Sequence, residues 1–290
     1  MLADSSSIPP DHKIMKGFEL ADLDFPSIDQ YRQRFSSVKP GHPWLSLDTQ
    51  DFLRMLNGWR KDRETGEEGI TLAALLMFGR YQSIIDVSAA PSYFVDYREK
   101  LDPVLRWNHR IYPDGTWHSN LLQFYQRVWP HLSADLKIPF HKEGIQRVDE
   151  TSVHSALREA FVNALIHSDY SAPGGIIIEK YRDGFTFTNP GTLLVSFEQL
   201  RRGGISECRN KALQNMFMMI GGGERAGSGV HTIQKEWKNQ LWRPPAFITE
   251  DNPDRFKVVL SMSSLIPETA IRKLEARFGR QFATRSEEHT

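Results

Sequence analysis

A glutamate and an asparagine stand four residues apart in a segment whose apolar residues repeat at helical spacing. In the run REAFVNALIHSDYS, Glu159 and Asn163 fall one helical turn apart, so a carboxylate and an amide oxygen point into the same space. Magnesium prefers hard oxygen ligands, so Asn163 together with phosphate oxygens would suit it, and Glu159 would polarise an attacking water. The alternative is an ordinary solvated helix face.

A glycine cluster further along the chain is the second candidate for chemistry. Gly227, Ser228 and Gly229 stand where a helix begins, and bare backbone amides at a helix N-terminus attract phosphate. The competing explanation is structural, because Gly221 to Gly223 also cap the preceding helix and lead into a turn.

The third candidate is the run Asn189-Pro190-Gly191 at a strand end, where a side-chain amide could face an adenine edge with both a donor and an acceptor. An ordinary β-turn explains the same residues. His167 and Asp169, just past the Glu-Asn helix, could approach phosphates, although a histidine at a helix end equally satisfies a carbonyl.

The elements that must position these residues follow from periodicity and turn signals. The pattern predicts a helix, a hairpin closed by Asp183-Gly184, a helix, a glycine loop, a helix and a second hairpin. Their expected ranges are 151–165, 176–181 with 185–188, 210–220, 228 to beyond 237, and 247–249 with 255–262. Upstream we expect helices at 28–35, 52–56 and 120–129, a strand at 93–97, and a buried helix or strand at 72–78.

The composition excludes several classes of protein. Lys plus Arg total 36 and Asp plus Glu total 36, so no net charge attracts nucleic acid or an acidic membrane. The single cysteine, Cys208, excludes an internal disulfide and a multi-cysteine zinc site. No apolar run approaches the roughly 18 residues that cross a bilayer, and the first residues lack a secretory signal. We therefore expect a cytoplasmic protein with no membrane partner.

Four motifs, in this order, together resemble those of a known protein family. REAFVNALIHSDYS, TNPG, SECRN and ERAGSGV resemble the C-terminal, RecG-like ATPase domain of Schlafen/AlbA-type transcriptional regulators, a divergent member of the GHKL ATPase group. The resemblance covers roughly residues 70–262. It implies an α+β fold, a GHKL (Bergerat)-like two-layer sandwich with a mixed sheet, preceded by a smaller α+β connecting region.

The resemblance also implies roles for individual residues. Glu159 matches the general base and Asn163 the magnesium ligand, while Asn189 stands where the wider group has an aspartate that reads adenine. Cys208 and Lys211 replace expected prolines in the lid region. The remaining residues that match ATP-binding positions are Gly191, Ser206, Arg209, Asn210, Arg225, Gly227, Ser228 and Gly229.

Four segments are expected. Residues 1–69 would be a connector at the tail of a missing N-terminal AlbA-type domain, and 70–145 an α+β connecting unit packed on the ATPase domain. Residues 146–263 would form the GHKL-like ATP-binding domain. Residues 264–290 would begin a truncated winged-helix region and end in a tail, Arg285 to Thr290, that resembles translated adapter sequence.

The resemblance implies a transcriptional regulator that binds ATP with Mg²⁺, and it leaves open whether the ATP is hydrolysed. The alternative is a nucleic-acid-binding regulator whose nucleotide fold is a non-catalytic scaffold. DNA or RNA would be bound through flanking domains, and a homo-oligomer is compatible with either function. Helicase activity is not expected, because the chain has no Gly-x-x-x-x-Gly-Lys-Ser/Thr loop.

Overall fold

The computed structural model describes residues 8–134, 136, 151–202, 207–223, 229–265 and 276–277. Its helices are α1 (Phe25–Val38), α2 (Thr49–Met55), α3 (Leu72–Phe78), α4 (Tyr81–Ile84), α5 (Leu121–Ser133), α6 (Ser152–Ile166), α7 (Phe197–Arg202), α8 (Lys211–Met219) and α9 (Gly229–Asn239). Its strands are β1 (Trp59–Lys61), β2 (Glu68–Ile70), β3 (Val95–Lys100), β4 (His109–Ile111), β5 (Ile176–Tyr181), β6 (Gly184–Pro190), β7 (Ala246–Glu250) and β8 (Arg255–Ser261).

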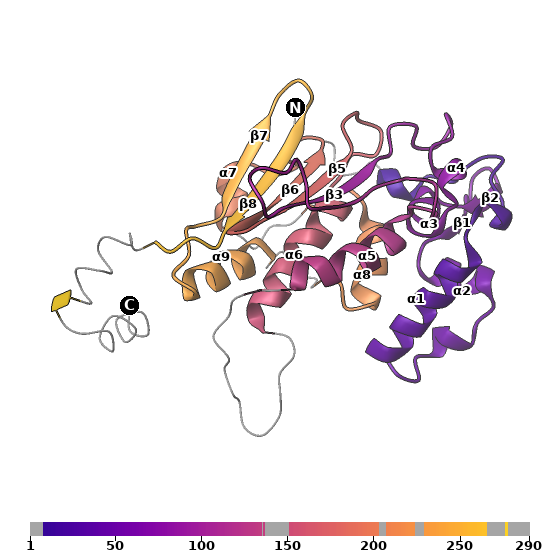
Figure 1. Cartoon of the computed structure of the whole chain (residues 1–290). Helices are drawn as coiled ribbons and strands as arrows, with labels where there is room; N and C mark the ends of the chain where they lie inside the picture. The colour runs from indigo at the N-terminus through magenta and orange to yellow at the C-terminus, as the bar shows by residue number, and fades with distance from the viewer. Residues whose placement is uncertain are drawn as a thin grey trace.

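A mixed sheet forms one layer of the molecule. Its six strands follow the order β4-β3-β5-β6-β8-β7, with β3 parallel to β5 and the other neighbours antiparallel. On β5, burial alternates, so that Ile176 and Ile178 face the core. Helices α5, α6, α8 and α9 lie on one side of this sheet (Figure 1). The expected two-layer α+β architecture with a mixed sheet is therefore confirmed.

Helix α6 is the central element of the helical layer. Thr151 and His154 form a reciprocal capping box that begins the helix, and its apolar face is buried. Phe161 stacks on Tyr125 of α5, with ring centroids 5.6 Å apart, and contacts Phe187 of β6. Because α6 is buried against sheet and helices at once, its remaining polar face is held at a fixed height above the sheet.

Most predicted elements are present, with shifted ends. The Asp183-Gly184 hairpin joins β5 to β6, and the apolar run at 72–78 is the buried helix α3. Strand β4 and the β3–β5 pairing had no signal in the local pattern. Since β3 and β5 are neighbours, the sheet takes strands from both sides of the boundary expected at 145/146.

Residues 8–84, with α1 to α4 and the β1–β2 pair, form a packed N-terminal unit where a connector was expected. Tyr31, Phe35, Phe52 and Phe78 are fully buried in it, and the rings of Tyr31 and Phe78 meet edge to face at 5.2 Å. These side chains belong to the same hydrophobic cluster as the core of α6 and the sheet. The unit is thus continuous with the rest of the molecule.

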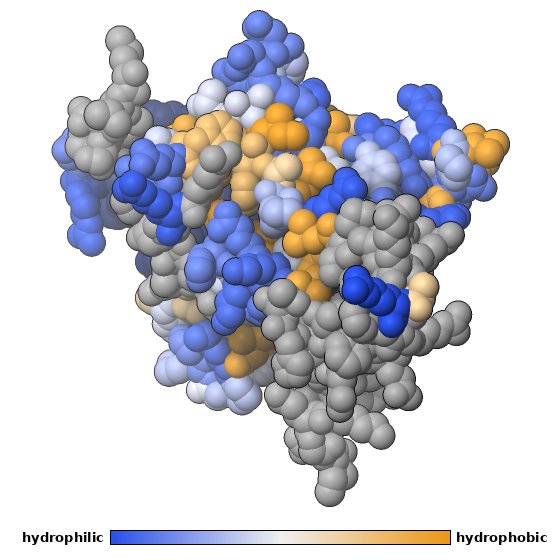
Figure 2. Space-filling model, turned by 90° about the vertical axis from the view of Figure 1, so that its left-hand side faces the viewer, coloured by the Kyte–Doolittle hydropathy of each residue, from blue (hydrophilic) through white to orange (hydrophobic). Residues whose placement is uncertain are grey.

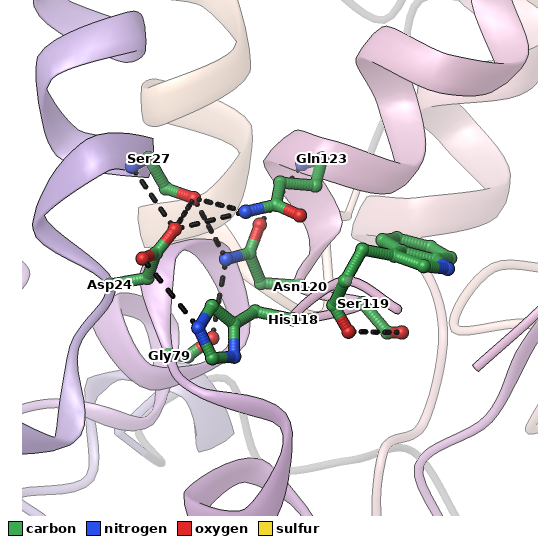
Figure 3. A network of polar contacts seen from close by, with 8 residues as sticks. Asp24, Ser27, Gly79, His118, Ser119, Asn120 and Gln123 are labelled. Carbon is green, nitrogen blue, oxygen red and sulfur yellow. Dashed lines mark hydrogen bonds and ion pairs between the residues drawn. The ribbon is translucent and has the colours of Figure 1, made fainter. Parts of the chain in front are cut away.

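A buried polar network joins the N-terminal unit to α5 (Figure 3). Asp24 caps α1, and its carboxylate accepts hydrogen bonds from the Ser27 amide and hydroxyl and from Nε2 of Gln123. Asn120 caps α5 and donates to Ser27 Oγ and to the carbonyl of Gly79 at the end of α3. Because Asp24, Ser27 and Asn120 are nearly inaccessible, this network fixes the relative positions of α1, α3 and α5.

Within the described ranges, no helix has the length and apolar character needed to span a membrane.

Candidate nucleotide site

The polar face of α6 carries the two residues expected to do chemistry. Nδ2 of Asn163 donates a hydrogen bond to Oε1 of Glu159 at 3.2 Å, as their spacing of one helical turn permits. This bond uses the amide nitrogen, so the amide oxygen of Asn163 can face a cation. Both side chains are half-buried and line a cavity between α6, α8, α9 and the sheet.

Two glycines distant in sequence lie against Glu159. A Cβ on Gly229, the first residue of α9, would come within 2.1 Å of Glu159 Oε1. A Cβ on Gly223, after α8, would come within 3.2 Å of Oε2. The carboxylate therefore fits against bare backbone at the N-terminus of α9, where a helix favours negative charge. Two of the candidates that the sequence indicated, the Glu-Asn pair and Gly229 of the glycine cluster, thus lie side by side.

The cavity is lined mostly by apolar side chains. About 1200 Å³ of space lies between its lining residues, open solvent at its mouth included. Phe247 of β7 and Phe256 of β8 stack with an interplanar angle of 10° along one side. The other apolar lining residues are Ala160, Val162, Ala164, Ile166, Leu193, Leu194, Val195, Leu200, Phe217, Met218, Val230, Ile233 and Val258.

One face of the molecule presents α7, β7, β8 and α9 (Figure 1). In Figure 2, hydrophobic surface lies in the middle of this face among hydrophilic side chains. Leu194, Phe197 and Ile248, from these elements and the segment before α7, are each more than a third exposed.

The strand end at Asn189 contributes one polar group to the cavity. Asn189 follows Phe185 and Phe187 on the helix-facing side of β6, lines the cavity and is 4% exposed. Gly191 does not line the cavity, although its neighbour Thr192 does. It has φ +103°, and a Cβ there would lie 2.9 Å from the Asp169 Cβ, so glycine is required by this turn.

The lining is electrically unusual for a site that would hold phosphates. Among its described residues none is lysine or arginine. Its acidic residues are Glu159 and Glu207, and Glu207 forms an ion pair with Lys211 Nζ at 2.8 Å. Burial, with a smaller contribution from Arg209, lowers the pKa of His167 to about 4, so this lining residue is neutral at pH 7.

Arg209 and Asn210 do not line the cavity, unlike the ligands expected from the resemblance. Arg209 donates to the carbonyls of His167 and Thr192 and lies 3.6 Å from the Asp169 carboxylate. Nδ2 of Asn210 donates to the carbonyls of Ile166 and Ser168. In this structure both residues join the end of α6 to the start of α8.

Four of the expected ligands lie outside the described residues: Ser206, Arg225, Gly227 and Ser228. The same holds for nearly all of the segment expected to begin a winged helix. Several lining residues had no sequence signal as ligands, among them Phe247, Phe256 and the apolar run 193–195. Their local pattern is that of core or strand residues. They form a cavity wall only because the tertiary fold brings them near α6.

A magnesium ion and a nucleotide fit the donor set. The described residues contain no cluster of three acidic, histidine or cysteine side chains that could hold a metal. The single amide oxygen of Asn163 beside Glu159 suits magnesium, which keeps waters and takes phosphate oxygens as ligands. The bare backbone at Gly223 and Gly229 lets the Glu159 carboxylate lie close to both glycines.

Comparison with known protein families finds two partial matches. Residues 174–260 match the family described as "Putative ATP-dependent DNA helicase recG C-terminal". This match includes β5 to β8 and the glycine turn, begins after α6, and supports an ATPase-like fold for this segment. Residues 1–96 match a domain of unknown function, DUF8451, which includes the N-terminal unit. No curated protein matches the chain.

Among solved structures, the chain is similar to the DIP2311 protein from Corynebacterium diphtheriae. The two share 17% identity, with a TM-score of 0.64, over 89% of this chain. The similarity extends over only 41% of the DIP2311 chain, so this chain spans less than half of that protein. At this identity the likeness concerns the fold, which DIP2311 shares across sheet and helices alike.

Proposed function

We propose that the chain binds ATP with magnesium in the cavity beneath α6 and hydrolyses it slowly, as a regulatory protein. The observation that carries the proposal is the position of Glu159, hydrogen-bonded to Asn163 and packed against Gly223 and Gly229 at one end of an apolar cavity. An ordinary solvated helix face would have no such enclosure. A scaffold that binds nothing would be expected to fill this space with side chains.

Each end of the cavity suits a different part of the nucleotide. The apolar walls with Asn189 offer burial and a hydrogen-bonding amide to a base. On the α6 side of the lining, Asn163 would hold magnesium, which would neutralise part of the phosphate charge. Glu159 would accept the proton of the attacking water, with Asn163 orienting its carboxylate.

The regulatory role is the finer part of the proposal. The family description for residues 174–260 concerns a DNA helicase, yet this chain lacks the phosphate loop of such motors. A nucleotide switch that acts on flanking DNA- or RNA-binding domains accounts for both facts. Binding would involve α7, since its Leu200 lines the cavity.

Titration of the protein with ATP, with and without magnesium, tests the binding site. Asn163→Ala should weaken Mg-ATP binding by about tenfold or more, equivalent to about 1.4 kcal/mol. Ser155→Ala is the matched control, because Ser155 is on the same face of α6 but exposed and outside the lining. Equal affinities for the wild type and Asn163→Ala would remove the metal role. Failure of the wild type to bind any nucleotide, together with salt-sensitive DNA binding, would favour the scaffold alternative.

Hydrolysis is tested separately with Glu159→Gln, which keeps the shape of the side chain but cannot accept a proton. We expect the turnover rate to fall by roughly 100-fold or more while Mg-ATP still binds. Phosphate release under single-turnover conditions measures this rate. Hydrolysis at the wild-type rate would contradict the assignment of Glu159 as the base.

A further inference from the structure

Helix α8 is held at both ends by the N-terminal unit. At its start, Oδ2 of Asp11 accepts a hydrogen bond from the amide of Leu213 at 2.9 Å. At its end, the Tyr31 hydroxyl donates to the carbonyl of Met216 at 2.7 Å, and Nε of Arg34 donates to the carbonyl of Ile220 at 3.1 Å. The first amides and last carbonyls of a helix lack partners within it, so these bonds satisfy groups that α8 cannot satisfy itself.

The groups that hold α8 are themselves firmly placed. Asp11 and Tyr31 are fully buried, and Tyr31 packs edge to face against Phe52 and Phe78. The buried network of Asp24, Ser27, Asn120 and Gln123 locks the start of α1 to α5 (Figure 3). Helix α1 therefore contacts α8 from a rigid platform, and α8 cannot shift along its axis unless these bonds break.

Helix α8 is also a wall of the cavity. Gln214, Phe217 and Met218 line it, and Gly223, just after the helix, lies against Glu159. Any movement of α8 would therefore change both the apolar wall and the surroundings of the proposed base.

We propose that the N-terminal unit regulates the cavity through α8, so that ligand binding and the packing of α1 on α8 are thermodynamically coupled. The proposal rests on the proposed nucleotide site for the identity of the ligand. Coupling of this kind is reciprocal. A ligand in the cavity should stabilise the contacts between α1 and α8, and loss of those contacts should weaken binding of the ligand.

Arg34→Met and Arg32→Met test this coupling as a matched pair. Both arginines are on α1, but Arg32 donates to the carbonyls of Leu45 and Asp48 inside the N-terminal unit, whereas Arg34 reaches α8. We expect Arg34→Met to weaken Mg-ATP binding by about fivefold or more, within the usual range of coupling energies, and Arg32→Met to change it less than twofold. Tyr31→Phe, which removes one hydroxyl and keeps the ring, should act like Arg34→Met.

Hydrogen exchange supplies a readout that general destabilisation would not produce. In the wild type, Mg-ATP should slow exchange of amides in α1, far from the cavity lining, and this protection should be lost in Arg34→Met but kept in Arg32→Met. If Mg-ATP binds the wild type but α1 exchange is unchanged, or if both variants bind alike, the coupling is refuted. If no nucleotide binds, the proposed function fails. Faster exchange of α8 amides in Arg34→Met, but not in Arg32→Met, would then still show that the N-terminal unit stabilises α8. Unchanged exchange of the α8 amides would overturn that stabilisation as well.

Discussion

At the scale of single residues, close approach between side chains and bare backbone defines the candidate site. Glu159 reaches Gly229 so closely that no residue with a Cβ could stand there unless the carboxylate moved. Asn163, one turn along, holds the same carboxylate. The site is thus specified by what two residue types allow, an acid that needs space and a glycine that provides it.

Asp11 is a second residue whose environment has a measurable consequence. Burial raises the pKa of its carboxyl to about 6, against backbone hydrogen bonds from α8 that lower it. Its Oδ1 accepts no hydrogen bond within the described part of the chain. Because the folded-state pKa is raised above the usual 3.8, the stabilising contribution is complete below about pH 4 and is lost as the pH rises through 6.

Asp11→Asn should therefore change the pH dependence of stability. The amide can still accept from Leu213 but cannot ionise, so the variant should avoid the cost of burying a charge, roughly 3 kcal/mol above pH 6. Urea unfolding at about pH 4 and pH 7.5 measures this: the variant should gain stability relative to wild type as the pH rises. A stability difference that is the same at both pH values would show that folding does not raise the pKa of Asp11.

At the scale of secondary elements, the C-terminus of α5 is hydrogen-bonded to a buried lysine of the sheet. Lys180 of β5 is 7% exposed, and its Nζ donates to the carbonyls of His131 and Ala134 at the C-terminus of α5. The positive charge meets the negative end of the helix dipole as well as two carbonyls that lack helical partners. This contact fixes α5 against the sheet beside α6.

Lys180→Met should destabilise the fold by about 2 kcal/mol, because two carbonyls at the end of α5 lose a charged donor while the apolar stem is kept. Lys257→Met is the control: Lys257 of β8 pairs with Glu250 on a partly exposed strand pair and should cost less than about 1 kcal/mol. Chemical denaturation of both variants gives the comparison. Equal losses in the free energy of unfolding would show that the Lys180–α5 contact stabilises the fold no more than the Lys257–Glu250 ion pair does.

At the scale of the whole molecule, one hydrophobic cluster runs from Met15 to Leu260. The N-terminal unit, α5, α6, α8 and the sheet contribute to it, and the hydrogen bonds on α8 cross between them. A chain built in this way cannot lose one part without exposing apolar surface of another.

The full chain should accordingly unfold in a single transition. Tryptophan fluorescence, reporting on Trp44 and Trp59 in the N-terminal unit and on Trp237 and Trp242 beside the sheet, should follow the same denaturation curve as far-ultraviolet circular dichroism. A separate early transition that vanished when Trp44 and Trp59 were replaced by phenylalanine would show that the N-terminal unit unfolds independently.

The local pattern of the sequence determined α6, the β5–β6 hairpin and the helix at Gly229, because helical spacing, turn residues and caps act over a few neighbours. It also placed Glu159 and Asn163 on one face, since helix geometry alone sets that relation. Only the tertiary structure decided that β3 lies beside β5, that Asp11 and Tyr31 hold α8, and that Arg209 and Asn210 bind carbonyls outside the cavity. These contacts join residues far apart in the chain. They depend on which apolar faces of similar composition pack together, and local spacing does not determine this.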